Sequence, residues 1–351
     1  MKKLTLLIIL AFLIQLVALP QSCLPDGIIF TTQTQIDSFQ INYPNCSVVE
    51  GNIEISGDDI INLDSLAVLT AIEGDLFIGY STALTSLYGL HNVTSVGETV
   101  RIYMNSALVN LLGLNSIVTI GQNLRITNND ILNDISALSN LTMVGENLRI
   151  YMNSELTTLS GLDNVTTVGD NLRITNNVLL TSISALSNLT SIAGELAIDN
   201  NDALISLEGL DSIDPESITD LVIRNNVLLS TCEVQSICDY LDVQNGDISI
   251  HSNATGCASK EEVISRCADA VYELSIPVFN IYPNPAQNNI SISISTKAVV
   301  DKVIIYNSLG QEVLSKNQLS ESIDVRMLSN GMYVIEIVSG YVKLRKKLIL
   351  R

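Results

Sequence analysis

Residues 145–168 read GENLRIYMNSELTTLSGLDNVTTV, and residues 97–120 read GETVRIYMNSALVNLLGLNSIVTI. Both stretches carry the same Arg-Ile-Tyr-Met-Asn-Ser core, followed by apolar residues at every third position. Such a fixed period is typical of a solenoid, whose stacked coils bury an apolar column that one coil cannot bury alone. The isoleucine of this core, here called the anchor, recurs every 24 residues at Ile78, Ile102, Ile126, Ile150, Ile174 and Ile198. Ile55 and Ile223, at the two ends of the array, are one residue out of phase.

The spacing within each coil favours β structure. A period of three is neither the helical period nor strict alternation, so it indicates a path that turns repeatedly around a shared column. An asparagine follows each anchor by three residues, where its amide can satisfy backbone groups left open at a turn. This row comprises Asn105, Asn129, Asn153, Asn177, Asn201 and Asn226. The sequence therefore predicts a mainly β fold, a parallel β-solenoid built from 24-residue coils.

A second period spans two coils. Residues 97–144 resemble residues 145–192 closely, so coils alternate between two types. A two-coil unit has therefore been duplicated, which favours an expanded array over a tailored active site.

The net charge of −19 and the pI near 4.3 restrict the possible partners. Nucleic-acid binding needs a basic footprint, so this acidity argues against DNA or RNA. The acidic excess precedes Ile276, and the remaining tail is mildly basic. A chain of 351 residues can hold two packed domains and a targeting segment.

Residues 1–22 have the features of a secretory signal peptide. Lys2 and Lys3 precede an apolar run from Leu4 to Leu19, and small or polar residues follow. The alternative is a retained membrane anchor, but the run is short for a span and no other segment could cross a bilayer. A lipoprotein site at Cys23 is a second alternative, and Pro20 fits that pattern poorly.

Six cysteines fit an exported protein. They lie on both sides of the coils, where disulfides could hold the end caps of the solenoid. They are Cys23, Cys46, Cys232, Cys238, Cys257 and Cys267. A zinc site is the alternative, but the chain has no Cys-x-x-Cys spacing and only two histidines, so we expect no metal and no cofactor. The last four cysteines allow three pairings.

The stretch from Cys23 through a helix-like segment at 33–41 to Asn45-Cys46-Ser47-Val48-Val49-Glu50-Gly51 resembles the entry to a receptor L domain. That domain is the leucine-rich-repeat-like solenoid of insulin- and EGF-receptor ectodomains. The resemblance covers residues 23–267, implies a disulfide between Cys23 and Cys46, and carries over no hormone-binding residue. No kinase domain or second membrane pass accompanies it in this sequence, so we do not expect a signalling receptor of that kind.

The tail carries a second resemblance. Short alternating strands separated by Gly and Asn turns predict a small Ig-like β-sandwich over residues 278–351, after a linker at 268–277. Its three motifs and its final basic strand resemble the C-terminal sorting domain of Bacteroidetes type IX secretion. The motif residues are Tyr282, Pro283, Asn284, Pro285, Gly310, Gly331 and Tyr333. The resemblance implies the type IX machinery as partner, passage across the outer membrane, a secreted or cell-surface location, and removal of this domain. An ordinary Ig-like binding domain is the alternative.

The residues that flank each anchor isoleucine should face outward, because strand side chains alternate. One such row is Arg101, Arg125, Arg149 and Arg173, and the other is Tyr103, Thr127, Tyr151 and Thr175. Arg forks suit carboxylate, sulfate or phosphate, and Tyr faces suit sugar rings. These rows predict a site for an acidic glycan or an acidic protein segment. The alternative is a solvated face with Arg paired to Glu98, Glu146 and Asp170.

Catalysis is not expected. The sequence contains no Ser/His/Asp or Cys/His set, no metal motif, no phosphate loop and no long insertion from one coil. We therefore expect an exported binding or adhesion protein without a membrane span after signal removal. A structural spacer without a specific ligand is the alternative, and a polysaccharide-active enzyme is a more distant one.

Overall fold

The computed structural model describes residues 21–243, 246–274, 279–294, 300–317, 322–339 and 342–351. The chain divides into two compact units, the first ending at Cys267 and the second beginning at Ala268. The expected signal segment falls outside the described residues, except for Gln21 and Ser22, which belong to the first strand.

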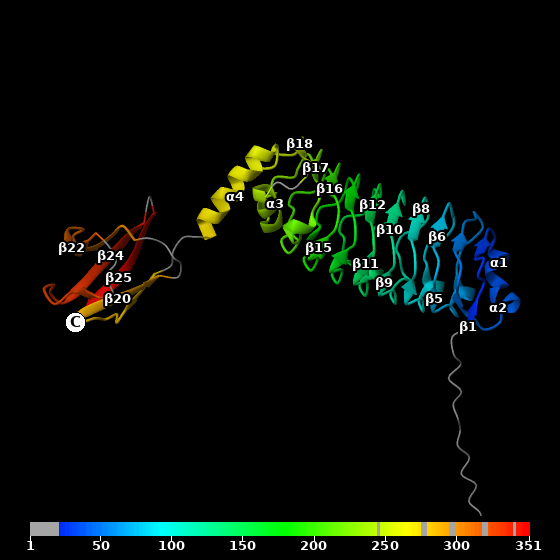
Figure 1. Ribbon diagram of the computed structural model, residues 1–351, viewed down its shortest axis with the longest axis horizontal. Helices are drawn as coiled ribbons and strands as arrows, with labels where there is room; N and C mark the ends of the chain where they lie inside the picture. The colour runs from blue at the N-terminus through cyan, green and yellow to red at the C-terminus, as the bar shows by residue number, and fades with distance from the viewer. Residues whose placement is uncertain (1–20, 244–245, 275–278, 295–299, 318–321, 340–341) are drawn as a thin grey trace, which may run out of the picture. The chain divides into compact units, whose positions relative to one another are not determined.

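The first unit is a solenoid with a long parallel sheet (Figure 1). Within the described residues this sheet has ten strands, and equivalent residues of successive coils stand in register. The strands are β2 (Ile28–Phe30), β4 (Ile53–Ile55), β6 (Leu76–Gly79), β8 (Val100–Tyr103), β10 (Leu124–Thr127), β12 (Leu148–Tyr151), β14 (Leu172–Thr175), β16 (Leu196–Asp199), β17 (Leu221–Arg224) and β18 (Ile248–His251). In this sheet, each strand from β4 to β17 contains one of the predicted anchor isoleucines, which confirms the parallel solenoid.

A second parallel sheet is formed by the short strands that precede the corner before a long strand. Its eight described strands are β1 (Gln21–Cys23), β3 (Cys46–Val49), β5 (Ala71–Ile72), β7 (Ser95–Val96), β9 (Thr119–Ile120), β11 (Met143–Val144), β13 (Thr167–Val168) and β15 (Ser191–Ile192). Short 3₁₀ turns complete several coils, namely η1 (Asp64–Leu66), η2 (Tyr88–Leu90), η3 (Ser136–Leu138), η4 (Ser184–Leu186) and η5 (Pro215–Ser217).

The apolar column is buried. Leu156, Leu159, Leu162, Val165 and Val168 of one coil are all fully buried, and their equivalents in neighbouring coils are buried with them. Burying such side chains stabilises a fold by about 1.5–3 kcal/mol each relative to exposure. Since each coil covers only its neighbours, this stabilisation requires stacking.

A ladder of amides runs along the solenoid beneath the long sheet. Asn129 is fully buried, and its Oδ1 accepts from the backbone N–H and from the Nδ2 of Asn105, both at 3.1 Å. Its own Nδ2 donates to the carbonyl oxygen of Ile102 at 3.1 Å. The other predicted asparagines repeat this pattern, so the row has the structural role expected of it. The ladder starts at Ser81 and ends at Asn253.

The first end of the column is closed by two short helices, α1 (Gln33–Asp37) and α2 (Phe39–Asn42). A capping box starts α1, because Thr32 accepts from the backbone N–H of Gln35 and the Gln35 side chain accepts from the N–H of Thr32. Phe39 packs edge-on against Phe30 of β2, at 5.8 Å between ring centroids. The Cys23–Cys46 disulfide joins β1 to β3, as the family resemblance implied.

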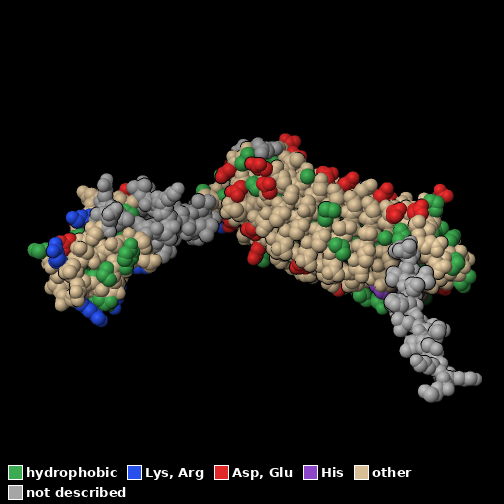
Figure 2. Space-filling view, turned by 60° about the horizontal axis from the view of Figure 1, so that its bottom comes forward, with side chains coloured by type: hydrophobic (Ala, Val, Ile, Leu, Met, Phe, Trp, Pro, Cys, Tyr) green, Lys and Arg blue, Asp and Glu red, His purple; other side chains and the backbone are tan. Residues whose placement is uncertain are grey.

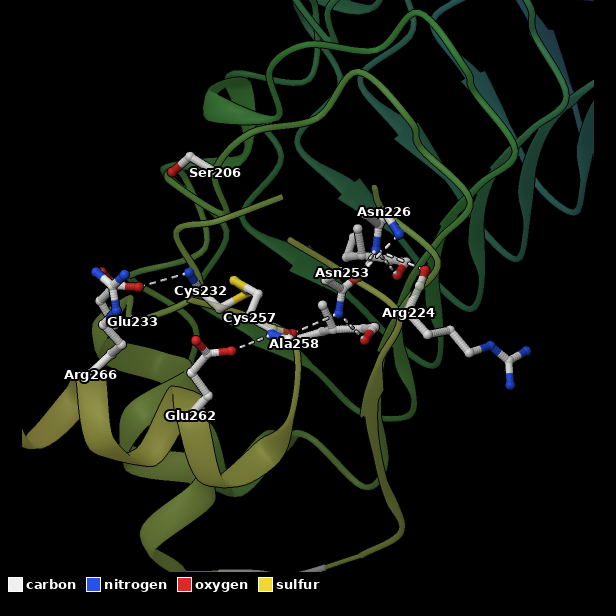
Figure 3. Close-up of a disulfide and its surroundings, with 12 residues drawn as sticks. Ser206, Arg224, Asn226, Cys232, Glu233, Asn253, Cys257, Ala258, Glu262 and Arg266 are labelled. Carbon is white, nitrogen blue, oxygen red and sulfur yellow. Dashed lines mark hydrogen bonds and ion pairs between the residues drawn. A yellow bond between two sulfur atoms is a disulfide. The ribbon is translucent and has the colours of Figure 1, made fainter. Parts of the chain in front are cut away.

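The other end is closed by α3 (Gln235–Val243) and α4 (Lys260–Leu274). Disulfides join Cys232 to Cys257 and Cys238 to Cys267, which selects one of the three open pairings. Figure 3 shows the first of these bonds beside the last amides of the ladder, Asn226 and Asn253. Two features differ from expectation. The final coil departs from the 24-residue spacing because α3 is inserted before β18, and α4 extends through 268–274 of the expected linker.

The second unit consists of two antiparallel sheets. One has β19 (Phe279–Tyr282), β20 (Asn289–Ile294) and β23 (Ile323–Asp324), and the other has β21 (Lys302–Tyr306), β22 (Glu312–Lys316), β24 (Gly331–Ser339) and β25 (Val342–Leu350). Phe279 and Ile290 of the first sheet share a buried core with Val303, Ile335 and Leu348 of the second. This two-layer packing is the predicted small β-sandwich.

Candidate functional site: the outer face of the long sheet

The outer face of the long sheet places four arginines side by side. Arg125 stands in register with Arg101 on β8 and with Arg149 on β12, and Arg149 stands in register with Arg173 on β14. Neighbouring strands lie about 4.8 Å apart, so like charges at equivalent positions repel one another. The sequence predicted this row, and the strand register produces it.

The four arginines have different surroundings. Arg173 donates from Nε to the Glu195 carboxylate at 2.6 Å and forms an ion pair with it. Arg101 lies over the ring of Tyr103, at 4.7 Å from the guanidinium carbon to the ring centroid, and Arg149 lies over Tyr151 at 4.6 Å. Arg125 forms no hydrogen bond, ion pair or ring contact with any described residue. Three of the four cations thus have no carboxylate partner among the described residues.

The alternative interpretation, in which the arginines pair with Glu98, Glu146 and Asp170, is not found in the described part of the chain. Glu146 instead accepts from the Nδ2 of Asn123 at 3.2 Å. Those carboxylates stand two residues before their strands, whereas Glu195 stands one residue before β16. The N–H of Glu195 accordingly donates to Asn171 as the N–H of Asn147 donates to Asn123. That shift brings Glu195 within reach of an arginine.

The second outward row alternates between large and small side chains. Tyr103 and Tyr151 flank Thr127, which is only 7% exposed, and Thr175 follows Tyr151 in register. We expected the Tyr faces to be open to sugar rings. In the structure a guanidinium covers one face of each ring, because arginine and tyrosine project from the same strand on the same side. The tyrosines therefore hold Arg101 and Arg149 in place.

A third row, which sequence reasoning missed, follows each long strand. Met104, Asn128, Met152 and Asn176 all have positive φ, between 53° and 59°. Met104 and Met152 are each 44% exposed, and the Oδ1 atom of Asn128 is buried without a partner in the described structure. The signal was present in the sequence, because both methionines belong to the duplicated Arg-Ile-Tyr-Met-Asn-Ser core.

An aromatic cluster at one end of the arginine row was also missed. The Tyr80 ring lies 5.3 Å from the Tyr103 ring and 6.1 Å from the Phe77 ring, measured between centroids, and Tyr80 is 53% exposed. Arg101 also contacts Phe77, at 5.5 Å. Gly79 leaves the space for this cluster, since a Cβ there would lie 2.4 Å from the Phe77 ring.

Beyond β14 the same face is neutralised internally. Ala197 replaces arginine on β16, and Arg224 on β17 donates to the Asp199 carboxylate at 3.0 Å. The adjacent Asn225 donates to the other oxygen of Asp199 at 3.0 Å. Among the described residues of this face, the arginines without a carboxylate partner are therefore those of β8, β10 and β12, and the solenoid surface carries many acidic side chains (Figure 2).

The second unit brings the predicted sorting motifs to defined positions. Asn284 lies between two cis peptide bonds, Tyr282–Pro283 and Asn284–Pro285, and its side chain bonds the backbone of Lys347 and Ile349 on β25. Gly310 is in the turn after β21 with φ of 76°, a conformation that favours glycine. Gly331 begins β24, and the hydroxyl of Tyr333 donates to the Ser329 carbonyl at 2.8 Å.

Two of these motifs meet at a pocket of about 430 Å³. Its lining includes Gly310, Tyr333, Tyr306 and Arg345. Arg345 and the Tyr306 hydroxyl both bond Glu336, which is 1% exposed. Burial and the Glu336 carboxylate raise the pKa of Tyr306, so this tyrosine stays protonated as a donor.

Two family models match the chain. The receptor L domain matches residues 142–266, and the secretion system C-terminal sorting domain matches residues 280–351. A search of curated proteins finds no match. The chain therefore combines a receptor L-domain solenoid with a type IX secretion sorting domain. It is a secreted or cell-surface protein with the type IX machinery as a partner.

Two further findings concern the described residues only. None of the helices they form is long and apolar enough to cross a membrane. No group of three or more His, Cys, Asp or Glu side chains among them is placed to hold a metal ion.

Proposed function

We propose that this protein is a non-enzymatic binding protein that recognises an anionic ligand outside the cell through the outer face of β8, β10 and β12. The observation that carries the proposal is the set of three in-register arginines, Arg101, Arg125 and Arg149, which have no carboxylate partner among the described residues. A receptor L domain suggests a binding role, and the sorting domain places that role at the cell surface or beyond it.

The electrostatics of the row support a ligand. Like charges on adjacent strands destabilise a sheet, and the repulsion falls only when a counter-charge is present. The same chain supplies counter-charges to Arg173 and Arg224, which lie one and three strands beyond β12, from Glu195 and Asp199 of the β16 coil. An anion bound to β8, β10 and β12 would do the same there.

The side chains suit binding rather than catalysis. Arginine presents a planar fork that matches carboxylate, sulfate or phosphate in a bidentate manner. Its partners on this face are tyrosine, threonine, methionine and asparagine, none of which forms a general acid–base pair at neutral pH. The surrounding acidic surface would repel anions elsewhere and direct them to the row.

The test uses the full-length protein and a panel of immobilised anionic polymers, namely hyaluronan, polygalacturonate, heparin and polyglutamate. The test variant carries Arg101→Gln, Arg125→Gln and Arg149→Gln together. The matched control carries Arg173→Gln and Arg224→Gln, which remove arginines of the same face that already have carboxylate partners.

We expect at least one polymer to bind the wild type, with affinity about 100-fold lower in the triple variant and changed less than about threefold in the control. Binding should also weaken with added salt. Equal loss in both variants would overturn the site assignment. No binding to any polymer would instead favour a structural spacer.

A further inference from the structure

We propose that the ligand of this face is a linear acidic polysaccharide that carries one charge per disaccharide and lies across the strands, along the axis of the solenoid. The inference rests on the proposed function and adds the class, direction and repeat of the ligand. The proposal rests on features of the outer face that repeat at every second strand. The surroundings of the arginines, the Tyr/Thr row and the Met/Asn row all alternate in this way.

The direction follows from the strand register. Arg101, Arg125 and Arg149 belong to three adjacent strands, so a ligand that contacts all of them must cross those strands. Glu98, Glu146 and Asp170 lie on the corner that precedes the strands, on one side of the arginine row. Their charge excludes a polyanion from that side. The ligand is thereby confined to the other side, over the Tyr/Thr row and the Met/Asn row.

The repeat follows from the alternation of coil types. β8 and β12 each present arginine stacked on tyrosine and followed by an exposed methionine. β10, between them, presents an uncovered arginine followed by Thr127 and Asn128. Equivalent features are thus two strands apart, about 9.6 Å.

The two stacked arginines are the charge sites. Stacking on Tyr103 and Tyr151 restricts the guanidinium groups, so less side-chain entropy is lost when each fork binds a carboxylate or sulfate. Two such forks spaced by two strands select a ligand whose charges have that spacing. An extended β-linked polysaccharide with one charge per disaccharide has a comparable repeat.

The strand between the charge sites carries two smaller polar residues, Thr127 and Asn128, which we call the polar notch. Thr127 is only 7% exposed, and it lies between the larger Tyr103 and Tyr151 of the adjacent strands. The Oδ1 atom of Asn128 is buried without a partner in the described structure, but the residue itself is partly exposed, so a turn of its amide would present this acceptor to a ligand. A hydroxyl of an uncharged sugar can donate to the acceptor in that position, and Met104 and Met152 provide apolar surface on either side.

Acidic peptides fit the repeat less well. An extended chain places same-side residues about 6.7 Å apart, which matches neither one strand nor two. A polyproline II helix repeats at about 9.3 Å, closer to the spacing, but proline lacks the N–H that the notch requires. The glycan is therefore favoured, and a polyproline II peptide with an acid at every third residue becomes the decisive competitor.

The experiment measures affinities of the full-length protein for size-defined probes in solution. The probes are a hyaluronan hexasaccharide, with one carboxylate per disaccharide, a galacturonate hexamer, with one per sugar, and the peptide (Pro-Pro-Glu)₄. Thr127→Tyr fills the notch with the residue that β8 and β12 already carry at this position. Thr175→Tyr is the matched control, beside the ion-paired Arg173.

We expect hyaluronan to bind more tightly than galacturonate although it carries half the charge. Thr127→Tyr should weaken hyaluronan binding by about tenfold, the loss of about one neutral hydrogen bond, and leave galacturonate binding nearly unchanged. Thr175→Tyr should change neither. Circular dichroism and the thermal midpoint check that both variants fold.

Four outcomes overturn the inference. Tighter binding of galacturonate, or an equal effect of both Thr→Tyr variants, removes the two-strand repeat while Arg-dependent anion binding survives. Tighter binding of the peptide removes the glycan assignment and again leaves the proposed function intact. Failure of every anionic probe to bind removes both proposals together.

Discussion

The outer face of the long sheet has two halves with the same backbone arrangement, but only one of them pairs its arginines with carboxylates. On β14 to β17, Arg173 and Arg224 each reach a carboxylate of the next or the preceding coil. On β8 to β12, Arg101 and Arg149 lie over tyrosine rings, and Arg125 contacts no charged group in the described structure. The difference shows that a solenoid can stack strands of the same geometry while one segment satisfies its charges internally and another leaves them for a partner.

The stability of both halves should depend equally on the amide ladder beneath them. Removing a ladder asparagine should therefore cause the largest loss of stability among the variants considered. Asn129→Ala and Asn201→Ala each remove a fully buried side chain that donates to the preceding coil and accepts from it. We expect a loss of about 3 kcal/mol in the free energy of unfolding for each, because buried partners are left unsatisfied. Chemical denaturation of the solenoid measures it.

Asn140→Ala is the control for this pair. Asn140 is exposed, and its side chain makes one hydrogen bond, to the carbonyl of Asn115 at 2.7 Å. A loss of about 0.5–1 kcal/mol is expected. If Asn201→Ala were much milder than Asn129→Ala, the two halves would not share one scaffold, and the comparison above would lose its basis.

An intermediate effect is expected from converting the paired half into an unpaired one. Glu195→Gln releases Arg173 and extends the row of free cations to β14. Affinity for the anionic polymer that binds the wild type should rise about fivefold, equivalent to about 1 kcal/mol. Surface plasmon resonance at low salt measures the gain.

Asp199→Asn controls for the added positive charge, since it releases Arg224, which is separated from β12 by β14 and β16. A gain below about twofold is expected there, because screening limits the reach of an exposed charge. Equal gains from both variants would show that net charge, and not the row, determines binding.

The smallest effect is expected from single arginine substitutions, which should change stability in opposite directions in the two halves. Arg125→Gln should raise the free energy of unfolding by about 0.3 kcal/mol, because it relieves repulsion from Arg101 and Arg149. Arg173→Gln should lower it by about 0.5 kcal/mol, because an exposed ion pair is lost. Thermal denaturation without ligand tests the pair, and the same sign for both would contradict the assignment of paired and unpaired halves.

Most of the fold could be predicted because each coil repeats the same local pattern. The anchor isoleucines, the buried leucines and the ladder asparagines recur at a fixed spacing, so any one coil predicts the next. The prediction failed where the repeat ends. β18 and Asn253 follow the inserted helix α3 and have no neighbour in the 24-residue spacing. The cap disulfides Cys232–Cys257 and Cys238–Cys267 likewise depend on the tertiary path of that segment.

The sequence predicted which side chains form the outward-facing rows of the candidate site, but it did not predict the contacts among them. Alternation along a strand placed Arg101 and Tyr103 on one outward face, as the structure has them. The sequence could not indicate that the guanidinium covers the ring, nor that Phe77 and Tyr80 join it, because these contacts depend on rotamers and on the space left by Gly79. The separation of unpaired from paired arginines also depends on one residue, since Glu195 stands one position nearer its strand than Glu146 does.

The sequence by itself determined the solenoid, the export route and the rows of side chains that face outward, because periodicity and strand alternation are local properties. Only the tertiary structure decided which cations have a counter-charge, since that depends on where a carboxylate of one coil lies relative to an arginine of another. The register brings Arg173 to Glu195 and leaves Arg125 without such a partner in the described chain. A contact between coils is a property of their stacking, and no single repeat contains it.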